Sequence, residues 1–137
     1  MSCEIKRYQF ELTELLESHG HTVIPFAAQN PKNFHHALSK YFPQGVDFDN
    51  PKLSDIARFL YSWPARKAIE RLIHDQKIDL VHLNIYYGQL TSSILSPLKS
   101  RGIPIIQTLH EYKIVCPVYT LLSHDKLCLD CKGGKFW

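Results

Sequence analysis

Several features that define common function classes are missing from this sequence. It has no apolar run of about 18 residues and therefore predicts no membrane-spanning helix, and its charged, periodic N-terminus does not predict a signal peptide. It has no block of like charges, because 16 basic and 13 acidic side chains are interspersed and leave a net charge of +3. This balance permits a weak anionic partner, such as a phosphate or a lipid surface, and does not indicate nucleic-acid binding.

Motifs with a defined chemistry are also missing. The sequence contains no G-x-G-x-x-G, Walker loop, G-x-S-x-G or H-E-x-x-H, and it has no internal repeat. Its 137 residues suit a single domain with a real core. The apolar share of 45% and charged share of 21% are ordinary for a globular protein.

Cysteine is scarce, with four in the chain. We expect a cytoplasmic protein, in which thiols stay reduced or bind metal before they form disulfides. Cys116, Cys128 and Cys131 have the spacing C-x11-C-x2-C, and the C-x2-C pair is typical of zinc knuckles. A closed zinc site needs a fourth ligand, from His124, His110 or elsewhere. The alternative is three reduced thiols in a loop.

The most informative stretch runs from Ile78 to Lys113 and predicts a complete strand–helix–strand unit. Asp79–Asn84 is an apolar run with a β-branched centre, and Ile105–Leu109 is a second such run. Leucines and isoleucines from 90 to 98 have helical spacing between them. Gly102 lies where the helix should end, and Pro97 predicts a kink or two short pieces. The two strands should be parallel, with a right-handed crossover.

The part of the chain before this unit predicts three helices and one strand. An amphipathic helix runs from Glu4 to His19, ends at Gly20 and is followed by the strand Thr22–Phe26, which should be parallel to the other two. Its apolar stripe consists of Ile5, Tyr8, Leu12, Leu15, Leu16 and His19. Asn50-Pro51 predicts the start of a second helix, with Leu53, Ile56, Ala57 and Leu60 as its apolar face. Ser62 predicts the cap of a third helix, in which Ala65, Ala68, Ile69, Leu72 and Ile73 repeat at intervals of three and four.

Polar and aromatic residues follow both strands of the central unit. Because ligands of parallel sheets bind beyond the carboxyl ends of the strands, Asn84, Tyr86, Tyr87, His110 and Glu111 are candidate site residues. The His110 imidazole can donate to a phosphate or a sugar hydroxyl, or can simply bond to a loop carbonyl. The two tyrosines can stack on a sugar ring or cover the core.

Three further polar features are better explained without a site. His82 lies two positions before Asn84 and therefore on the same strand face, where we expect a bracing hydrogen bond rather than a ligand role. Asp47-Phe48-Asp49 is similar to the D-x-D pair that holds a metal in some sugar transferases, but it lies in a loop, where solvated acids are expected. His35-His36 is expected to be surface.

These segments together resemble the N-terminal domain of family-4 glycosyltransferases of the GT-B type. The resemblance spans nearly the whole chain, from LTELLESHGHTVIPF through YSWPARKAIERLI and IDLVHLN to GIPIIQTLHEYKIVCPVYTLL and C-x2-C-KGGKFW. Its most specific part is Thr108-Leu109-His110-Glu111-Tyr112-Lys113 followed by Cys116-Pro117.

The resemblance implies an incomplete α/β Rossmann-like domain, with a parallel sheet flanked by helices, over residues 1–137. Such enzymes are retaining transferases of bacterial surface polysaccharide synthesis and carry a sugar from a nucleotide-sugar donor to a glycan or lipid-linked acceptor. This domain would receive the acceptor, and His110 would act on the donor sugar near the phosphate. The resemblance implies no cofactor, although a structural zinc remains open, and it allows peripheral association with the inner face of the membrane.

The sequence departs from the family pattern in four ways. Glu111 replaces the usual Asp, and Asn84 replaces the second His of an H-x-H strand. The family's first strand with its glycine-rich turn and its nucleotide-binding C-terminal domain are both missing from this sequence, so we expect the isolated chain to transfer no sugar. Two alternatives stay open: a small flavodoxin-like or other Rossmann-like protein acting alone, which would need a phosphate-binding turn, and a small zinc-knuckle binding module using Cys116, Cys128 and Cys131.

Overall fold

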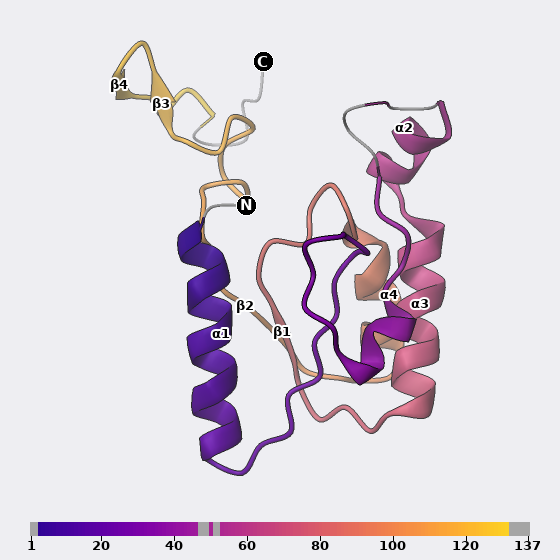
Figure 1. Cartoon of the computed structure of the whole chain (residues 1–137). Helices are drawn as coiled ribbons and strands as arrows, with labels where there is room; N and C mark the ends of the chain where they lie inside the picture. Colours follow the sequence, from indigo (N-terminus) through magenta and orange to yellow (C-terminus); the bar gives the residue numbers. More distant parts are fainter. Residues whose placement is uncertain (1–2, 47–49, 51–52, 132–137) are drawn as a thin grey trace.

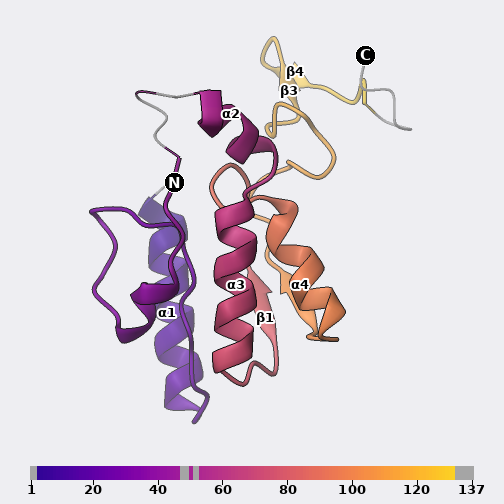
Figure 2. The same cartoon turned by 90° about the vertical axis from the view of Figure 1, so that its right-hand side faces the viewer.

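The computed structural model describes residues 3–46, 50 and 53–131. Two helices, α1 (Cys3–Ser18) and α3 (Trp63–Asp75), are the longest elements, and η1 (Ala37–Tyr41) and α2 (Leu53–Leu60) lie between them in the chain. Then follow β1 (Val81–Leu83), η2 (Ser92–Ile94), α4 (Leu95–Ser100), β2 (Ile105–Gln107), β3 (Leu122–Ser123) and β4 (Lys126–Leu127). The strand pair β1–β2 lies between α1 on one side and α3 with α4 on the other (Figures 1 and 2). No helix among the described residues is long and apolar enough to cross a membrane.

The strands β1 and β2 are parallel, as the sequence predicts. Val81 pairs with Ile105, and Leu83 pairs with Gln107. The ladder continues at both ends, where the Val81 amide donates to the Pro104 carbonyl and the Thr108 amide donates to the Leu83 carbonyl. Both strands are shorter than the predicted runs. The fold is therefore α/β, with a small parallel sheet flanked by helices, as expected for part of a Rossmann-like domain.

The predicted strand at residues 22–26 is wrong. The segment is not assigned to a strand and belongs to neither sheet of the described chain. Extended backbone becomes a strand only where a second backbone runs beside it and completes its hydrogen bonds. Ile24 and Phe26 nevertheless pack against the core, which explains the apolar pattern of the segment.

The helix α3 contributes the largest share of the core, and its predicted apolar positions are all confirmed. The buried face consists of Ala65, Ala68, Ile69, Leu72 and Ile73. Leu83 of β1, Ile94 of η2 and Leu98 of α4 pack against most of it, and Ile94 and Leu98 are fully buried. Burying such side chains stabilises the fold by about 1.5–3 kcal/mol each.

Three buried hydroxyl groups join the start of α3 to the start of η2. The Ser62 hydroxyl caps α3 by accepting from the Ala65 amide, as predicted. The Thr91 hydroxyl oxygen accepts from the Ser62 amide at 3.0 Å, and the Ser93 hydroxyl donates to the Ser62 or Leu90 carbonyl. These bonds satisfy polar atoms that would otherwise destabilise the interior. They also hold Thr91 at a φ of 61°, a backbone conformation that favours glycine.

The segment around Pro97 forms two short pieces, as predicted. The 3-10 turn η2 leads directly into α4, and Pro97 lies in the first turn of α4, where its missing N–H is tolerated. Gly102 and Gly20 end α4 and α1 with positive φ values of 66° and 83°, and both ends are closed by backbone bonds of the Schellman type. These two predicted ends are confirmed.

The helix α2 exposes the face that the sequence predicts as buried. Ile56 and Leu60 are 58% and 74% exposed and Ala57 is also exposed, whereas Asp55 on another face is buried. An ion pair between Asp55 and Arg58 at 3.7 Å partly compensates for this burial. The predicted start of α2 at Asn50-Pro51 lies partly outside the described residues. The Leu53 side chain, which completes the predicted face, also lies outside them.

The chain after Lys113 contains a small hairpin that the sequence did not predict. The strands β3 and β4 are antiparallel, and their turn residues His124 and Asp125 have φ values of 50° and 59°. Two consecutive positive φ values are typical of the tight turn that matches the twist of a two-stranded ribbon.

Candidate active site

The candidate residues of the sequence meet at the carboxyl ends of β1 and β2. Asn84 follows β1 directly, and His110 lies three residues after β2. Because the strands are parallel and in register, both ends lie at the same edge of the sheet. The prediction that these positions come together is confirmed. Their functional roles remain a prediction.

His110 is held by contacts from two directions. Its Nε2 atom is 2.9 Å from the Asn84 side-chain oxygen. The Tyr8 ring of α1 contacts the imidazole edge to face, with 5.2 Å between the ring centres. The imidazole is half-buried, so it is oriented by the protein and still accessible to a ligand.

A second set of hydrogen bonds lies beside the bond between His110 and Asn84. The His82 Nε2 atom is 2.7 Å from the Thr108 hydroxyl oxygen, which is also 3.3 Å from the Tyr8 hydroxyl. The bracing bond predicted for His82 is therefore present. Thr108 and Tyr8 connect the two strands to α1 at the edge that carries His110.

The two tyrosines after β1 form an aromatic wall. The ring centres of Tyr86 and Tyr87 are 4.8 Å apart, and the Gln107 amide donates to the Tyr87 hydroxyl at 2.9 Å. Burial raises the pKa of Tyr87, and the charges of Tyr86 and Glu111 add to this effect. Tyr87 therefore stays a neutral hydroxyl at physiological pH and can donate a hydrogen bond.

Lys113 places a positive charge over this wall. Its ammonium group lies 5.9 Å from the centre of the Tyr87 ring and 3.8 Å from that of Tyr119. Glu111 is half-buried and makes no hydrogen bond or ion pair within the described part of the chain. The edge thus combines an imidazole, a carboxylate, an ammonium group and aromatic faces, a set that can bind a phosphate and a sugar.

The cysteines do not form the predicted metal site. Cys116, Cys128 and Cys131 are free thiols, as expected for reduced cysteines. Backbone N–H groups, above all that of Leu121, lower the pKa of Cys116, whereas burial raises the pKa of Cys131. Among the described residues, no three His, Cys, Asp or Glu side chains lie close enough together to hold a metal ion. The zinc site and the zinc-knuckle alternative are therefore unsupported.

Of the two remaining motifs, the structure describes one. His35 and His36 are exposed, as predicted, and the His36 ring accepts from the Leu38 amide at the start of η1. The Asp47-Phe48-Asp49 motif lies outside the described residues.

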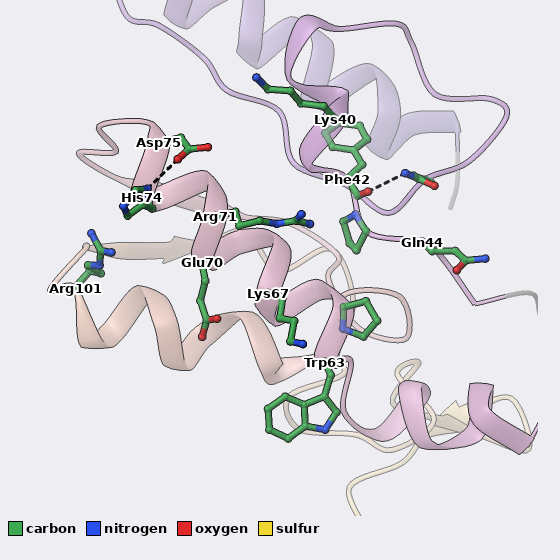
Figure 3. Close-up of a pocket in the computed structure, with 13 residues that line it drawn as sticks. Lys40, Phe42, Gln44, Trp63, Lys67, Glu70, Arg71, His74, Asp75 and Arg101 are labelled. Carbon is green, nitrogen blue, oxygen red and sulfur yellow. Dashed lines mark hydrogen bonds and ion pairs between the residues drawn. The ribbon is translucent and has the colours of Figure 1, made fainter.

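A separate open groove of about 830 Å³ lies over the outer face of α3 (Figure 3). Its walls carry the cations Lys40, Lys67, Arg71 and Arg101 and the acids Glu70 and Asp75, and Trp63 lies at one end. No predicted site residue lines it. We therefore place the candidate active site at the strand ends, where the reactive side chains converge, rather than in this groove.

Several residues of this edge were not predicted as site residues. Tyr8 was assigned to the apolar stripe of the first helix and Gln107 to a strand, while Thr108 and Lys113 were noted only as parts of the motif Thr108–Lys113. The sequence signal for Gln107 and Thr108 was a polar side chain at the end of an apolar strand, because buried polar atoms there need hydrogen-bond partners. The role of Tyr8 depends on how α1 packs, and no local pattern reveals that.

Comparison with known proteins identifies the family of the chain. The family described as Glycosyltransferase Family 4 matches residues 5–123, which is most of the chain. No curated protein matches the chain significantly. No solved structure does so either.

The matched range includes most of α1, the core of α3, both parallel strands and every residue of the edge that carries His110. The α/β fold agrees with this match. The chain therefore belongs to glycosyltransferase family 4 and to the glycosyltransferase class of enzymes.

Proposed function

We propose that this chain forms the acceptor-side, Rossmann-like domain of a retaining glycosyltransferase. The enzyme moves a sugar from a nucleotide-sugar donor to a glycan or lipid-linked acceptor in the synthesis of bacterial surface polysaccharides. It requires no cofactor. The observation that carries the proposal is the half-buried His110, which is held at the carboxyl end of β2 by Asn84 and Tyr8.

His110 acts in this proposal on the sugar–phosphate region of the donor. When the bond between the sugar and the diphosphate breaks, negative charge develops on the leaving oxygen. A positioned imidazole that donates a hydrogen bond near this group stabilises the transition state more than the ground state. Lys113 supplies a positive charge nearby, and Tyr86, Tyr87 and Glu111 bind the sugar and acceptor hydroxyl groups.

The test is a steady-state assay of sugar transfer. The protein is purified in full from its native cells, together with any polypeptide that co-purifies with it. His110→Ala should lower turnover by about 100-fold or more, since positioned hydrogen-bond donors contribute about that much. Nucleotide binding, measured by calorimetry, should stay nearly unchanged. His124→Ala is the matched control, because His124 is exposed and, in the part of the chain that the structure describes, its side chain bonds only to the adjacent Ser123. Unchanged turnover in His110→Ala would contradict the proposed role.

We also propose that the protein works in the cytoplasm, at the inner face of the membrane. Support comes from α2, whose Ile56 and Leu60 are exposed, and from Trp63 at the start of α3, which is 59% exposed. The basic groove over α3 continues from Trp63 (Figure 3). Exposed apolar and indole side chains beside cations suit the headgroup region of an anionic bilayer.

A further inference from the structure

We infer that Lys113 binds the diphosphate of the donor and that Tyr119 is the positioning residue that holds Lys113 for this task. The inference rests on the proposed function and adds to it. In the proposed function Lys113 is only a charge near the reacting groups, and Tyr119 has no role. The acceptor-side domain thereby contributes a binding group of its own to the diphosphate.

The ammonium group of Lys113 carries a charge that no acid of the described chain neutralises. Glu111 lies two residues before Lys113, and neither side chain forms an ion pair among the described residues. An ammonium group has three N–H donors and no acceptor, so it can bind only an acceptor and prefers an anionic one. Lys113 is half-buried and follows His110 by three residues. The diphosphate is the anion that the proposed reaction brings to this edge.

Two aromatic rings hold the ammonium group. It lies 3.8 Å from the centre of the Tyr119 ring and 5.9 Å from the centre of the Tyr87 ring. Tyr87 belongs to the aromatic wall after β1, whereas Tyr119 belongs to the loop after β2, so Lys113 connects the two segments. A cation–π contact orients an ammonium group, and a neutral ring leaves its charge in place. Lys113 is therefore positioned and still able to bind an anion.

Tyr119 has an uncommon backbone conformation. Its φ is 64°, a value that residues other than glycine rarely adopt. Two backbone hydrogen bonds of 3.0 Å hold it there: the Tyr119 amide donates to the Cys116 carbonyl, and the Tyr112 amide donates to the Tyr119 carbonyl. The second bond joins Tyr119 to the residue next to Lys113. Residues with such strain cluster at ligand sites, and here the strained residue places its ring against a cation.

The first experiment tests the position of Lys113 without a ligand. Protons above a tyrosine face are shifted upfield by the ring current, so the ε-methylene protons of Lys113 should resonate upfield of those of other lysines. Their signals are identified by their loss in Lys113→Gln. Tyr119→Phe should keep the upfield shift, and Tyr119→Leu should remove most of it. Tyr112→Leu is the control and should leave it unchanged, because the Tyr112 ring is 55% exposed and contacts no cation among the described residues. An ordinary chemical shift in the wild type would overturn the inference.

The second experiment uses inorganic pyrophosphate as the probe for the diphosphate. Titration of the full chain should move the Lys113 signals to saturation, and sodium chloride at the same ionic strength should move them far less. In calorimetry, Lys113→Gln should weaken pyrophosphate binding about 10-fold or more, the usual size of a hydrogen bond to a charged group. Lys126→Gln is the control, because Lys126 is exposed on β4 and forms no ion pair in the described part of the chain. A wild type without saturable binding would overturn the inference, whether or not any variant folds.

Turnover separates diphosphate binding from a purely structural role. Tyr119→Leu should raise KM for the donor about 2- to 30-fold, the usual size of a cation–π contact, and leave KM for the acceptor unchanged. Tyr119→Phe should restore donor KM. The effect of Tyr119→Leu should disappear in the Lys113→Gln background, because Tyr119 acts through Lys113. An equal effect in that background would overturn the role of Tyr119. A change in acceptor KM alone would show that Lys113 binds an acidic group of the acceptor and would overturn the assignment to the diphosphate.

The outcomes distinguish this inference from the proposed role of His110. If His110→Ala leaves turnover unchanged while pyrophosphate binds at Lys113, the role of His110 fails and the diphosphate site stands. If His110→Ala lowers turnover while pyrophosphate leaves the Lys113 signals in place, only this inference fails.

Discussion

At the scale of single residues, the buried hydroxyl group of Ser93 is a sensitive point of the fold. Its side chain is fully buried, and its hydroxyl joins the chain before α3 to the turn before η2. Ser93→Ala leaves the carbonyls of Ser62 and Leu90 without this donor. It should therefore lower the free energy of unfolding by about 1–3 kcal/mol, the usual penalty for an unsatisfied buried polar group.

Chemical denaturation of the wild type and the variant measures this difference. Ser92→Ala is the control, because Ser92 is the exposed neighbour of Ser93 and its loss should change stability little. Equal effects of the two variants would show that the buried bonds do not stabilise the fold.

Residue-level sequence patterns predicted the positions of His110 and Asn84 at the candidate site better than they predicted the residues that contact them. His110 and Asn84 were predicted because each follows an apolar strand, and the carboxyl ends of parallel strands lie at the same edge of a sheet. Tyr8 was not found, since a tyrosine on an apolar helical stripe has the same pattern whether it enters the core or lies over an imidazole. Which of these occurs depends on tertiary packing.

At the scale of elements, η1 and α3 are joined by a charged hydrogen bond that makes stability depend on pH. The Tyr41 hydroxyl donates to the Asp75 carboxylate at 2.7 Å. The pKa of Asp75 lies below its usual range because His74 and then Tyr41 donate hydrogen bonds to the carboxylate. The unfolded state therefore takes up a proton first as pH falls below about 3.9. This contribution to stability is complete above that pH and is lost between about 3.9 and the lowered pKa.

Tyr41→Phe should reduce this pH dependence. Without the tyrosine hydroxyl, the pKa of Asp75 moves toward its usual range, so less stability is lost as the solution is acidified through that window. Urea titrations at pH values above and within the window measure the effect. Tyr61→Phe is the control, because the Tyr61 hydroxyl accepts from Arg66 and has no carboxylate partner among the described residues. An identical pH dependence in wild type and Tyr41→Phe would contradict the assignment.

The helix α2 shows where element-level prediction fails. Periodicity identifies an apolar face at Ile56, Ala57 and Leu60 but does not say what covers that face. In α3 the same kind of pattern correctly identified the core, because β1 and α4 pack against it. The strand prediction at residues 22–26 failed for a related reason, since pairing depends on a partner that is distant in the sequence.

The exposed apolar face of α2 supports a prediction about membrane binding. The chain should sediment with vesicles that contain phosphatidylglycerol and much less with vesicles of phosphatidylcholine alone. Leu60→Ser and Trp63→Ser should each weaken binding several-fold, because they remove exposed apolar area next to cations. Leu127→Ser on the hairpin is the control, since Leu127 is 68% exposed and lies on another part of the molecule (Figure 1). Equal loss in the control would contradict a specific lipid-binding surface.

At the scale of the whole molecule, the sequence predicted the α/β class, the parallel strand pair and the family, because each depends on local sequence patterns. The hairpin β3–β4 was not predicted, since its short strands carry no alternating apolar pattern and are exposed on both sides. The metal alternative has no support among the described residues, because cysteine spacing alone does not bring enough ligands together.

The peripheral position of α1 has a consequence for the kinetics of local opening. No α1 side chain belongs to the described core cluster or to the residues packed against it, whereas α3 contributes much of that cluster. Amide protons of α1 should therefore exchange with deuterium much faster than those of α3, by a subglobal opening that leaves the core folded. Hydrogen exchange followed by mass spectrometry measures both helices in one experiment, and equal protection would show that α1 opens only with the whole fold. Each such opening moves the Tyr8 ring away from His110. A bound sugar that requires the Tyr8–His110 contact should therefore slow the exchange of the α1 amide protons.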